Sequence, residues 1–105
     1  MANITKEKAF EIWEQAFGNV LYAKDVAGAW MIKDQYGNTT KLGFGWEIDH
    51  KVPESKGGSD SNFNLRPLHW ENNRSKLDNY PSWTSVVTSQ GNHNIYWETH
   101  WTFNK

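Results

Sequence analysis

The stretch EIDHKVPESKGGSDSNFNLRPLHWENNRSK, residues 47–76, decides the fold of this 105-residue chain. It opens as the end of an apolar strand that delivers Asp49 and His50. It continues through a segment rich in Pro, Gly, Ser, Asp and Asn, which is typical of a loop. Residues 64–68 predict a second short strand, and residues 69–79 predict a short helix. A strand pair packed on a helix would bring the Asp-His end and one helical face into the same small volume.

The short helix is predicted to have a polar face beside an apolar stripe. The polar face carries His69, Asn73 and Lys76. The apolar stripe consists of Trp70 and Leu77. We expect the stripe to be buried against the strands, which would leave Asn73 facing the Asp-His pair.

The clearest helix of the chain lies upstream, within residues 3–19. Phe10, Trp13 and Phe17 recur at helical spacing and predict a surface that packs against the rest of the domain. Gly18 is placed to end this helix in a left-handed conformation.

Two β-hairpins are predicted on either side of the central unit, so the expected fold class is α+β. Residues 27–33 and 39–48 flank the turn-like segment DQYGN, which indicates the first hairpin. The tail alternates from residue 94 onward and turns near residues 91–92, which indicates the second. The side chains expected on one face of the tail are Ile95, Trp97, Thr99, Trp101 and Phe103.

Composition limits the classes of protein to which the chain can belong. Its length suits one domain, residues 1–105. The absence of Cys excludes disulfides and thiolate zinc sites, so His, carboxylate, amide or water must hold any metal. No segment reads as a signal peptide or membrane span, so we expect a cytoplasmic protein without a membrane partner. The net charge of −1 argues against strong nucleic-acid binding, which depends on Lys and Arg.

The residues that are expected to meet in the central unit suit phosphodiester chemistry. Mg²⁺ takes oxygen ligands and keeps several waters, so the Asp49 carboxylate and the Asn73 amide oxygen would suffice on the protein side. An imidazole such as that of His50 can deprotonate an attacking water near neutral pH. Arg74 and Lys76 would neutralise phosphate charge.

The central unit resembles the HNH endonuclease motif of the ββα-metal superfamily. That superfamily includes colicin-type DNases, small phage and bacterial nucleases, and one nuclease domain of RNA-guided effectors. The matching letters are DH at 49–50, PESKGG at 53–58, NLRPL at 64–68 and NRSK at 73–76. A spaced pattern of several elements is far more specific than any one of them. The resemblance implies a ββα-metal core at about residues 44–79 and a metal-dependent DNA endonuclease.

The resemblance also implies roles for individual residues. Asp49 would bind the metal, and His50 would be the general base. Asn64 would orient the loop and the catalytic imidazole by hydrogen bonds. Asn73 would be the second metal ligand, which makes the chain an H-N-N version of the motif. Asn72 stands directly before it, and the choice between the two asparagines stays open.

The expected metal follows from the ligand types. An amide oxygen favours Mg²⁺ at a single site, with Mn²⁺ as a substitute. Leu77 occupies the place of the extra helical His of some colicin-type members, so we expect little use of zinc or nickel. Lys51 and Arg66 flank the site and are predicted to contact phosphates.

The predicted function is hydrolysis of DNA, and three alternatives stay open. They are cleavage of RNA, a domain that binds nucleic acid or protein without cutting, and a phage accessory or inhibitor protein that acts through protein contacts. Sequence specificity, nicking against double-strand cleavage, oligomeric state and protein partners are also open. Contact with few phosphates would give weak binding that falls quickly with salt.

Overall fold

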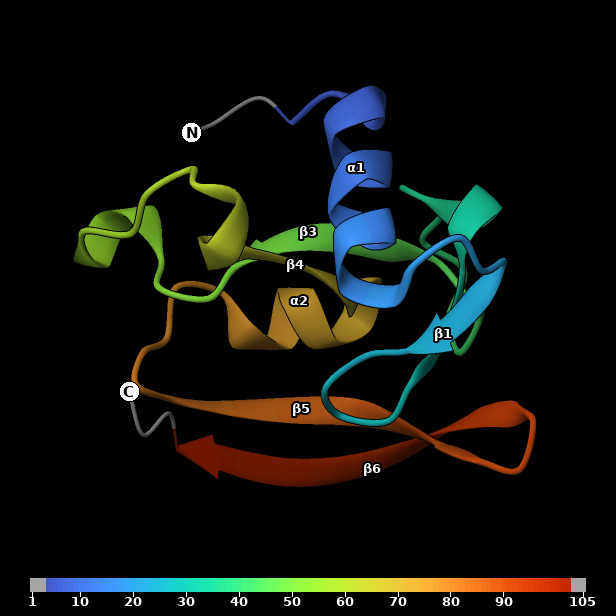
Figure 1. The fold of residues 1–105 in the computed structure, drawn as a ribbon. Coiled ribbons are helices and arrows are strands. Elements are labelled where there is room, and N and C mark those ends of the chain that lie inside the picture. The colour runs from blue at the N-terminus through green and yellow to red at the C-terminus, as the bar shows by residue number, and fades with distance from the viewer. Residues whose placement is uncertain (1–3, 103–105) are drawn as a thin grey trace.

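Helix α1 (Lys6–Phe17) forms where the apolar spacing predicts it. The structure, a computed structural model, describes residues 4–102 (Figure 1). The Thr5 hydroxyl accepts a hydrogen bond from the Lys8 amide at 3.1 Å and caps the first turn. Gly18, at φ 80°, follows the last turn. The buried side chains of α1 are those of Ala9, Ile12 and Trp13.

The remaining elements are short. They are β1 (Tyr22–Lys24), β2 (Trp30–Ile32), β3 (Trp46–His50), β4 (Leu65–His69), α2 (Trp70–Lys76), β5 (Ser82–Gln90) and β6 (His93–Thr102), with 3-10 turns at Lys33–Gln35, Glu54–Lys56 and Asn62–Asn64. Within residues 4–102 the strands form three separate antiparallel pairs, β1 with β2, β3 with β4 and β5 with β6. The fold class is α+β, as predicted. Neither helix in this part of the chain has the length and apolar character needed to cross a bilayer.

Aromatic side chains form the core between α1 and the β3–β4 pair. Trp13 and Trp46 are fully buried, with ring centroids 5.0 Å apart. Phe10 and Tyr36 pack against Trp46 at centroid distances of 6.3 Å and 4.8 Å. Large rings bury much apolar area per residue, so a chain of low hydrophobic content can still hold its strands in place.

The predicted hairpin over residues 27–48 is wrong, because β2 pairs with β1 instead. Asp25 closes the turn between them: its carboxylate accepts hydrogen bonds from the amides of Ala27 and Ala29, both at 2.9 Å. Gly28, at φ 91°, completes the turn. The segment DQYGN therefore does not reverse the chain between two paired strands, and its first two residues lie in a 3-10 turn.

The β3–β4 pair carries the Asp-His dipeptide at its end, as predicted. Asp49 lies opposite Arg66 in the register of the two strands. Residues 51–63 form the predicted loop between them. At Gly58 a Cβ atom would lie 1.7 Å from the carbonyl oxygen of Val52, so only glycine allows the loop to fold back this closely.

Helix α2 buries polar side chains, which corrects the predicted apolar stripe. It ends at Lys76 rather than at Asn79, and Leu77 is 70% exposed with φ 51°. The buried side chains of α2 are Asn72 and Lys76. His69 is fully buried, and its side chain caps the first turn of the helix.

Two buried carboxamides join the separate strand pairs. Asn72 of α2 accepts a hydrogen bond from the amide of Val87 in β5 at 2.8 Å and donates one to its carbonyl at 3.0 Å. Asn94 of β6 makes the same two-way pair with Trp30 of β2, at 2.8 Å and 3.0 Å. Each side chain thus pairs as a peptide group does in a sheet. The β5–β6 hairpin is thereby tied to both α2 and β2.

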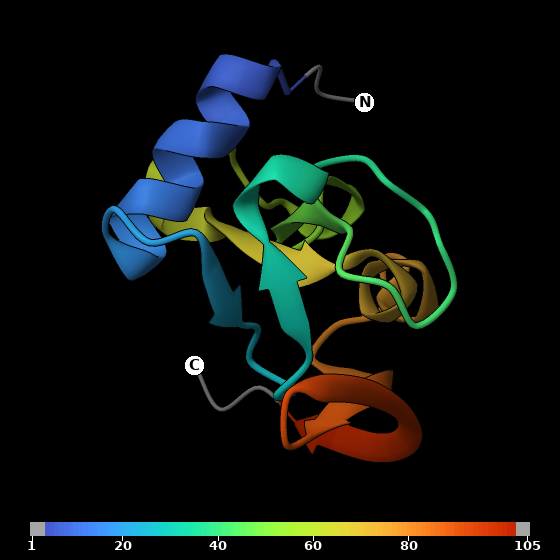
Figure 2. The same cartoon turned by 90° about the vertical axis from the view of Figure 1, so that its right-hand side faces the viewer.

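The elements stack in layers (Figures 1 and 2). Helix α1 lies over one side of the β3–β4 pair, and α2 lies between that pair and the β5–β6 hairpin. The hairpin turns between Gln90 and His93, as predicted for the tail. Within the predicted apolar face of the tail, Trp97 is exposed and Phe103 lies outside the described residues.

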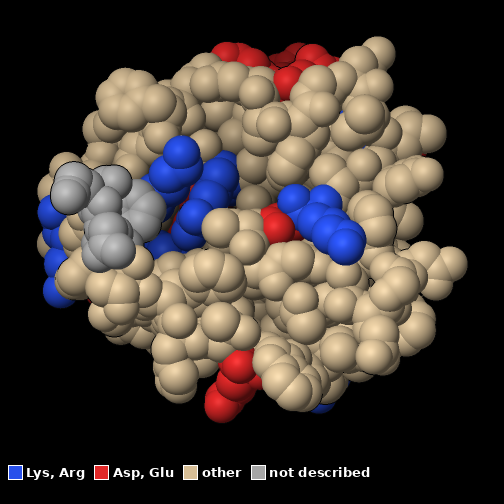
Figure 3. Space-filling view, turned by 60° about the horizontal axis from the view of Figure 1, so that its bottom comes forward, with Lys and Arg blue, Asp and Glu red and all other residues tan. Residues whose placement is uncertain are grey.

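Charged side chains are unevenly spread over the surface. Figure 3 shows Lys and Arg side chains gathering in the middle of one face, while most Asp and Glu side chains of that face lie at its upper and lower edges. Lys24, Lys51 and Arg66 line one hollow of about 330 Å³. A chain of net charge −1 therefore still presents a local concentration of positive charge.

Candidate functional site

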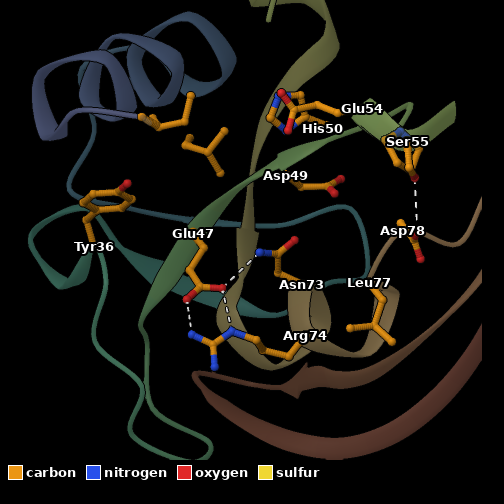
Figure 4. A pocket seen from close by; sticks show the side chains of 13 residues that line it. Tyr36, Glu47, Asp49, His50, Glu54, Ser55, Asn73, Arg74, Leu77 and Asp78 are labelled. Carbon is orange, nitrogen blue, oxygen red and sulfur yellow. Dashed lines mark hydrogen bonds and ion pairs between the residues drawn. The ribbon is translucent and has the colours of Figure 1, made fainter. Parts of the chain in front are cut away.

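An open pocket of about 720 Å³ lies beside the ββα unit made by β3, β4 and α2 (Figure 4). Asp49 and His50 enter it from the end of β3, and Asn73 and Arg74 enter it from α2. Glu47 lines it as well, two residues before Asp49 on the same strand. The fold therefore brings together the three residues predicted to carry the chemistry.

The Asp49 carboxylate is buried between two cations. It is 3% exposed, and its two oxygens lie 2.8 Å from Nε of Arg66 and 3.0 Å from Nζ of Lys76. Lys76 also donates a hydrogen bond to the backbone carbonyl of His50 at 3.0 Å. The two ion pairs offset the cost of burying a charged carboxylate, and they fix its position at the floor of the pocket.

Glu47 orients the side chain of Asn73. The amide nitrogen of Asn73 donates a hydrogen bond to the Glu47 carboxylate at 3.0 Å. Because a carboxylate only accepts hydrogen bonds, this contact turns the amide oxygen the other way. Figure 4 shows that oxygen on the Asp49 side. The two oxygen donors predicted for a metal thus face the same space.

Glu47 also binds Arg74 and acts on Tyr36. The Arg74 guanidinium contacts both Glu47 oxygens, at 3.2 Å and 2.6 Å. The hydrogen bond from this group to Glu47 and the charge of the carboxylate raise the pKa of Arg74 above its ordinary value. Burial, and then the Glu47 charge, raise the pKa of the Tyr36 phenol. Arg74 is 58% exposed and so lies at the rim of the pocket.

The imidazole of His50 has acidic neighbours from the loop. Its Nε2 lies 2.7 Å from an oxygen of Asp60. The carboxylate of Glu54 lies close by, so that one ligand atom from each of the three residues falls within 4.8 Å of the others. Figure 4 shows the Glu54 carboxylate beside the His50 ring at the upper end of the pocket.

The side chain of Asn64 forms hydrogen bonds with the backbone of the loop. Its amide oxygen accepts a hydrogen bond from the Val52 amide at 3.0 Å. Its amide nitrogen donates to the carbonyls of Val52 at 3.1 Å and Ser59 at 2.7 Å. The loop is thus closed at both ends by one buried side chain, and these contacts reach the backbone and not the ring of His50.

The predicted phosphate contacts differ in how they are placed. Lys76 is 1% exposed and forms an ion pair with Asp49, so its ammonium group does not lie on the surface. Arg66 is mostly buried, pairs with Asp49 and stacks its guanidinium over Trp83 at 5.5 Å. Lys51 lines the second hollow. Arg74 is exposed and lines the main pocket.

Asn72 and Asn73 have different roles in the structure. Asn72 is fully buried, and its side chain forms hydrogen bonds with Val87 and Asp25 instead of facing the pocket. Asn73 points into the pocket. The sequence did not predict the contacts of Glu47 with Asn73 and Arg74. It also did not predict the contact of Asp60 with His50. The alternation of side chains along β3 places residues 47 and 49 on one face and could have found Glu47, whereas no spacing rule locates a loop residue such as Asp60.

Comparison with known proteins agrees with this geometry. Residues 37–79 match the family model described as HNH endonuclease. The match covers β3, the loop, β4 and α2, so the segment that builds the pocket is similar to the HNH endonuclease family. No curated protein and no solved structure matches the chain.

Proposed function

We propose that this chain is a metal-dependent endonuclease that hydrolyses DNA phosphodiester bonds. The observation that carries the proposal is the pocket in which Asp49, His50 and Asn73 meet from a strand end and a helix. The family match supports a nuclease-type function and a nucleic-acid substrate. In this proposal residues 1–105 act as one nuclease domain.

The oxygen donors of the pocket suit a hard divalent cation. A carboxylate offers about four acceptor positions, and Arg66 and Lys76 each take one of those on Asp49. The Asn73 amide oxygen faces the same space. Such ligands in a pocket open to water fit Mg²⁺, with Mn²⁺ as a substitute. Asp49 and Asn73 would hold the cation, which when bound stabilises charge on the scissile phosphate and the leaving oxygen.

The chain's own side chains supply the proton transfer and the substrate contact. Water provides the oxygen that joins the phosphorus and gives up its proton to His50, while the bond from phosphorus to the leaving sugar oxygen breaks. That oxygen takes up a proton from solvent. Arg74 keeps N–H groups that Glu47 does not use, and these can bind a phosphate oxygen at the rim.

The test is a plasmid-nicking assay in Mg²⁺ with the parent chain, His50→Ala and Asn73→Ala. Loss of a general base costs about 10²–10⁴-fold in rate, so His50→Ala should cut at most at about one hundredth of the parental rate. The matched control is His93→Ala, which removes an exposed histidine at the start of β6 and should cut at the parental rate.

Two results would contradict the proposal. Cutting that survives His50→Ala would remove the imidazole from the mechanism. Cutting of a single-stranded RNA faster than any DNA would show that RNA, and not DNA, is the substrate. Chelation of divalent ions should stop the parental reaction, and cutting that persists in excess chelator would contradict the metal requirement.

A second candidate is a domain that binds nucleic acid without cutting it. The double ion pairing of Asp49 favours it, because two cations already neutralise the carboxylate that would hold the metal. This candidate predicts retention of a labelled DNA duplex on the protein with no strand cleavage in either Mg²⁺ or Mn²⁺.

A further inference from the structure

The loop of residues 51–63 places the Asp60 carboxylate against the imidazole of His50, the predicted general base. Asp60 accepts a hydrogen bond at Nε2 of His50, with the two atoms 2.7 Å apart. The Asp60 side chain is 59% exposed, so burial does not force this contact. A neutral imidazole has one N–H and one lone pair. Because Asp60 can only accept, the N–H lies at Nε2 and the basic lone pair lies at Nδ1.

The backbone on both sides of Asp60 is held in place. The Ser59 carbonyl accepts a hydrogen bond from the buried amide of Asn64 at 2.7 Å. The Ser61 carbonyl accepts one from the Asn64 backbone amide at 2.8 Å. One residue therefore fixes the chain immediately before and immediately after Asp60.

The same loop is also bound to helix α1. The Asn62 side chain donates hydrogen bonds to Glu11 at 2.8 Å and to Gln15 at 3.1 Å, and it accepts one from Lys8. These contacts join two segments about fifty residues apart in the sequence. The loop position of Asp60 is thus set by the folded domain and not by local chain preference.

We propose that Asp60 is a positioning residue for His50, held on the imidazole by Asn64 and by the contacts of the loop with α1. This inference rests on the proposed nuclease function. Asp60 presents the basic Nδ1 to the attacking water by holding Nε2 as the donor. Asn64 then affects the position of the His50 ring indirectly, because it holds the loop that holds Asp60.

If Asp60 were only a passive surface charge, its removal would change KM and not kcat. A carboxylate near a phosphate-binding pocket repels the substrate, so its removal alone would strengthen DNA binding and leave the chemical step unchanged. A positioning role predicts that Asp60→Ala lowers kcat while KM stays the same or falls. Removal of a residue that orients a site residue by a hydrogen bond costs about 10–100-fold in activity. We therefore expect kcat of Asp60→Ala to fall by about 10–100-fold.

The experiment measures kcat and KM for a DNA duplex with the parent, Asp60→Ala, Asp60→Asn and a matched control. Asp60→Asn keeps an oxygen acceptor and should retain more activity than Asp60→Ala. The control Glu98→Gln removes one negative charge from an exposed position of β6 and should leave both constants unchanged. Equal kcat in the parent and Asp60→Ala would overturn the inference while the nuclease function stands.

Nuclear magnetic resonance of the histidine rings tests the contact without any activity. In the metal-free parent, the His50 ring should show an Nε2–H proton that is protected from exchange with water, and Asp60→Ala should lose it. An unchanged signal in Asp60→Ala overturns the inference even if the protein proves inactive. Titration with Zn²⁺ tests the other reading of the His50, Glu54 and Asp60 group: direct coordination of a ring nitrogen at stoichiometric metal would overturn the positioning role.

Discussion

Replacement of Lys76 by Met tests whether the buried ion pair holds the floor of the pocket. Methionine keeps a flexible apolar stem of similar length, with sulfur in place of one methylene, and lacks the ammonium group. The lost contacts are those of Nζ with the Asp49 carboxylate and with the His50 carbonyl, both at 3.0 Å. A Lys side chain is rarely buried unless it has a partner, so its buried contacts matter to the fold. We therefore expect the Lys76→Met replacement to lower the free energy of unfolding by a large amount.

The size of the effect follows from the burial of both partners. Removal of one member of a buried ion pair costs about 3–5 kcal/mol, because the other charge is left without compensation. Asp49 keeps its contact with Arg66 at 2.8 Å, so the lower end of that range applies, about 3 kcal/mol. At about 4–6 °C per kcal/mol for a domain of this size, the melting temperature should fall by roughly 12–18 °C.

The assay is urea and thermal unfolding followed by tryptophan fluorescence, which seven Trp residues make sensitive. Lys41→Met is the matched control, since Lys41 is exposed and its loss should change stability by less than about 0.5 kcal/mol. The double variant with Asp49→Ala should lose less than the sum of the single variants. A Lys76→Met protein as stable as the control would refute the reasoning.

The remaining predictions concern other contacts of the fold and pocket. Asn72→Ala should lower the free energy of unfolding by roughly 3 kcal/mol, because its buried partners are left unpaired. Asn73→Ala should melt close to the parent and lose Mg²⁺-dependent nicking. Thermal unfolding and nicking measured on both variants therefore distinguish a structural asparagine from a site asparagine. Gly58→Ala should lower the urea midpoint, because its Cβ would meet the Val52 carbonyl; an unchanged midpoint would contradict this. The raised pKa of Tyr36 favours the neutral phenol in the fold, so stability should be constant well below pH 10.0 and fall as pH rises above it. Tyr36→Phe should flatten that fall in unfolding measured across alkaline pH.

The sequence predicts the elements whose signal is local. Helix α1 follows from the spacing of aromatic side chains, and the β5–β6 hairpin follows from alternation around a Gly-Asn turn. The strand that ends in Asp49 and His50 follows from an apolar run that precedes a loop. These patterns depend on neighbours within a few residues, so no knowledge of distant segments is needed.

The sequence does not predict the elements that depend on distant polar contacts. Helix α2 buries Asn72 and Lys76 because their partners lie on β5 and β3, and a helical wheel assigns such residues to the solvent. The pairing of β2 with β1 depends on the Asp25 carboxylate, which no hydrophobic pattern records. In the pocket, Asp49, His50 and Asn73 could be named from spacing, but the contact of Asp60 with the ring could not.

The reciprocal pairs of Asn72 with Val87 and of Asn94 with Trp30 have a consequence for how the molecule comes apart. Three strand pairs that shared no such links could melt one after another, each at its own temperature. With the links in place, the outer hairpin cannot detach without exposing amide groups on the layers that it leaves. We therefore expect hydrogen exchange to report one cooperative unfolding unit, which would split in two when either carboxamide is replaced by an apolar side chain.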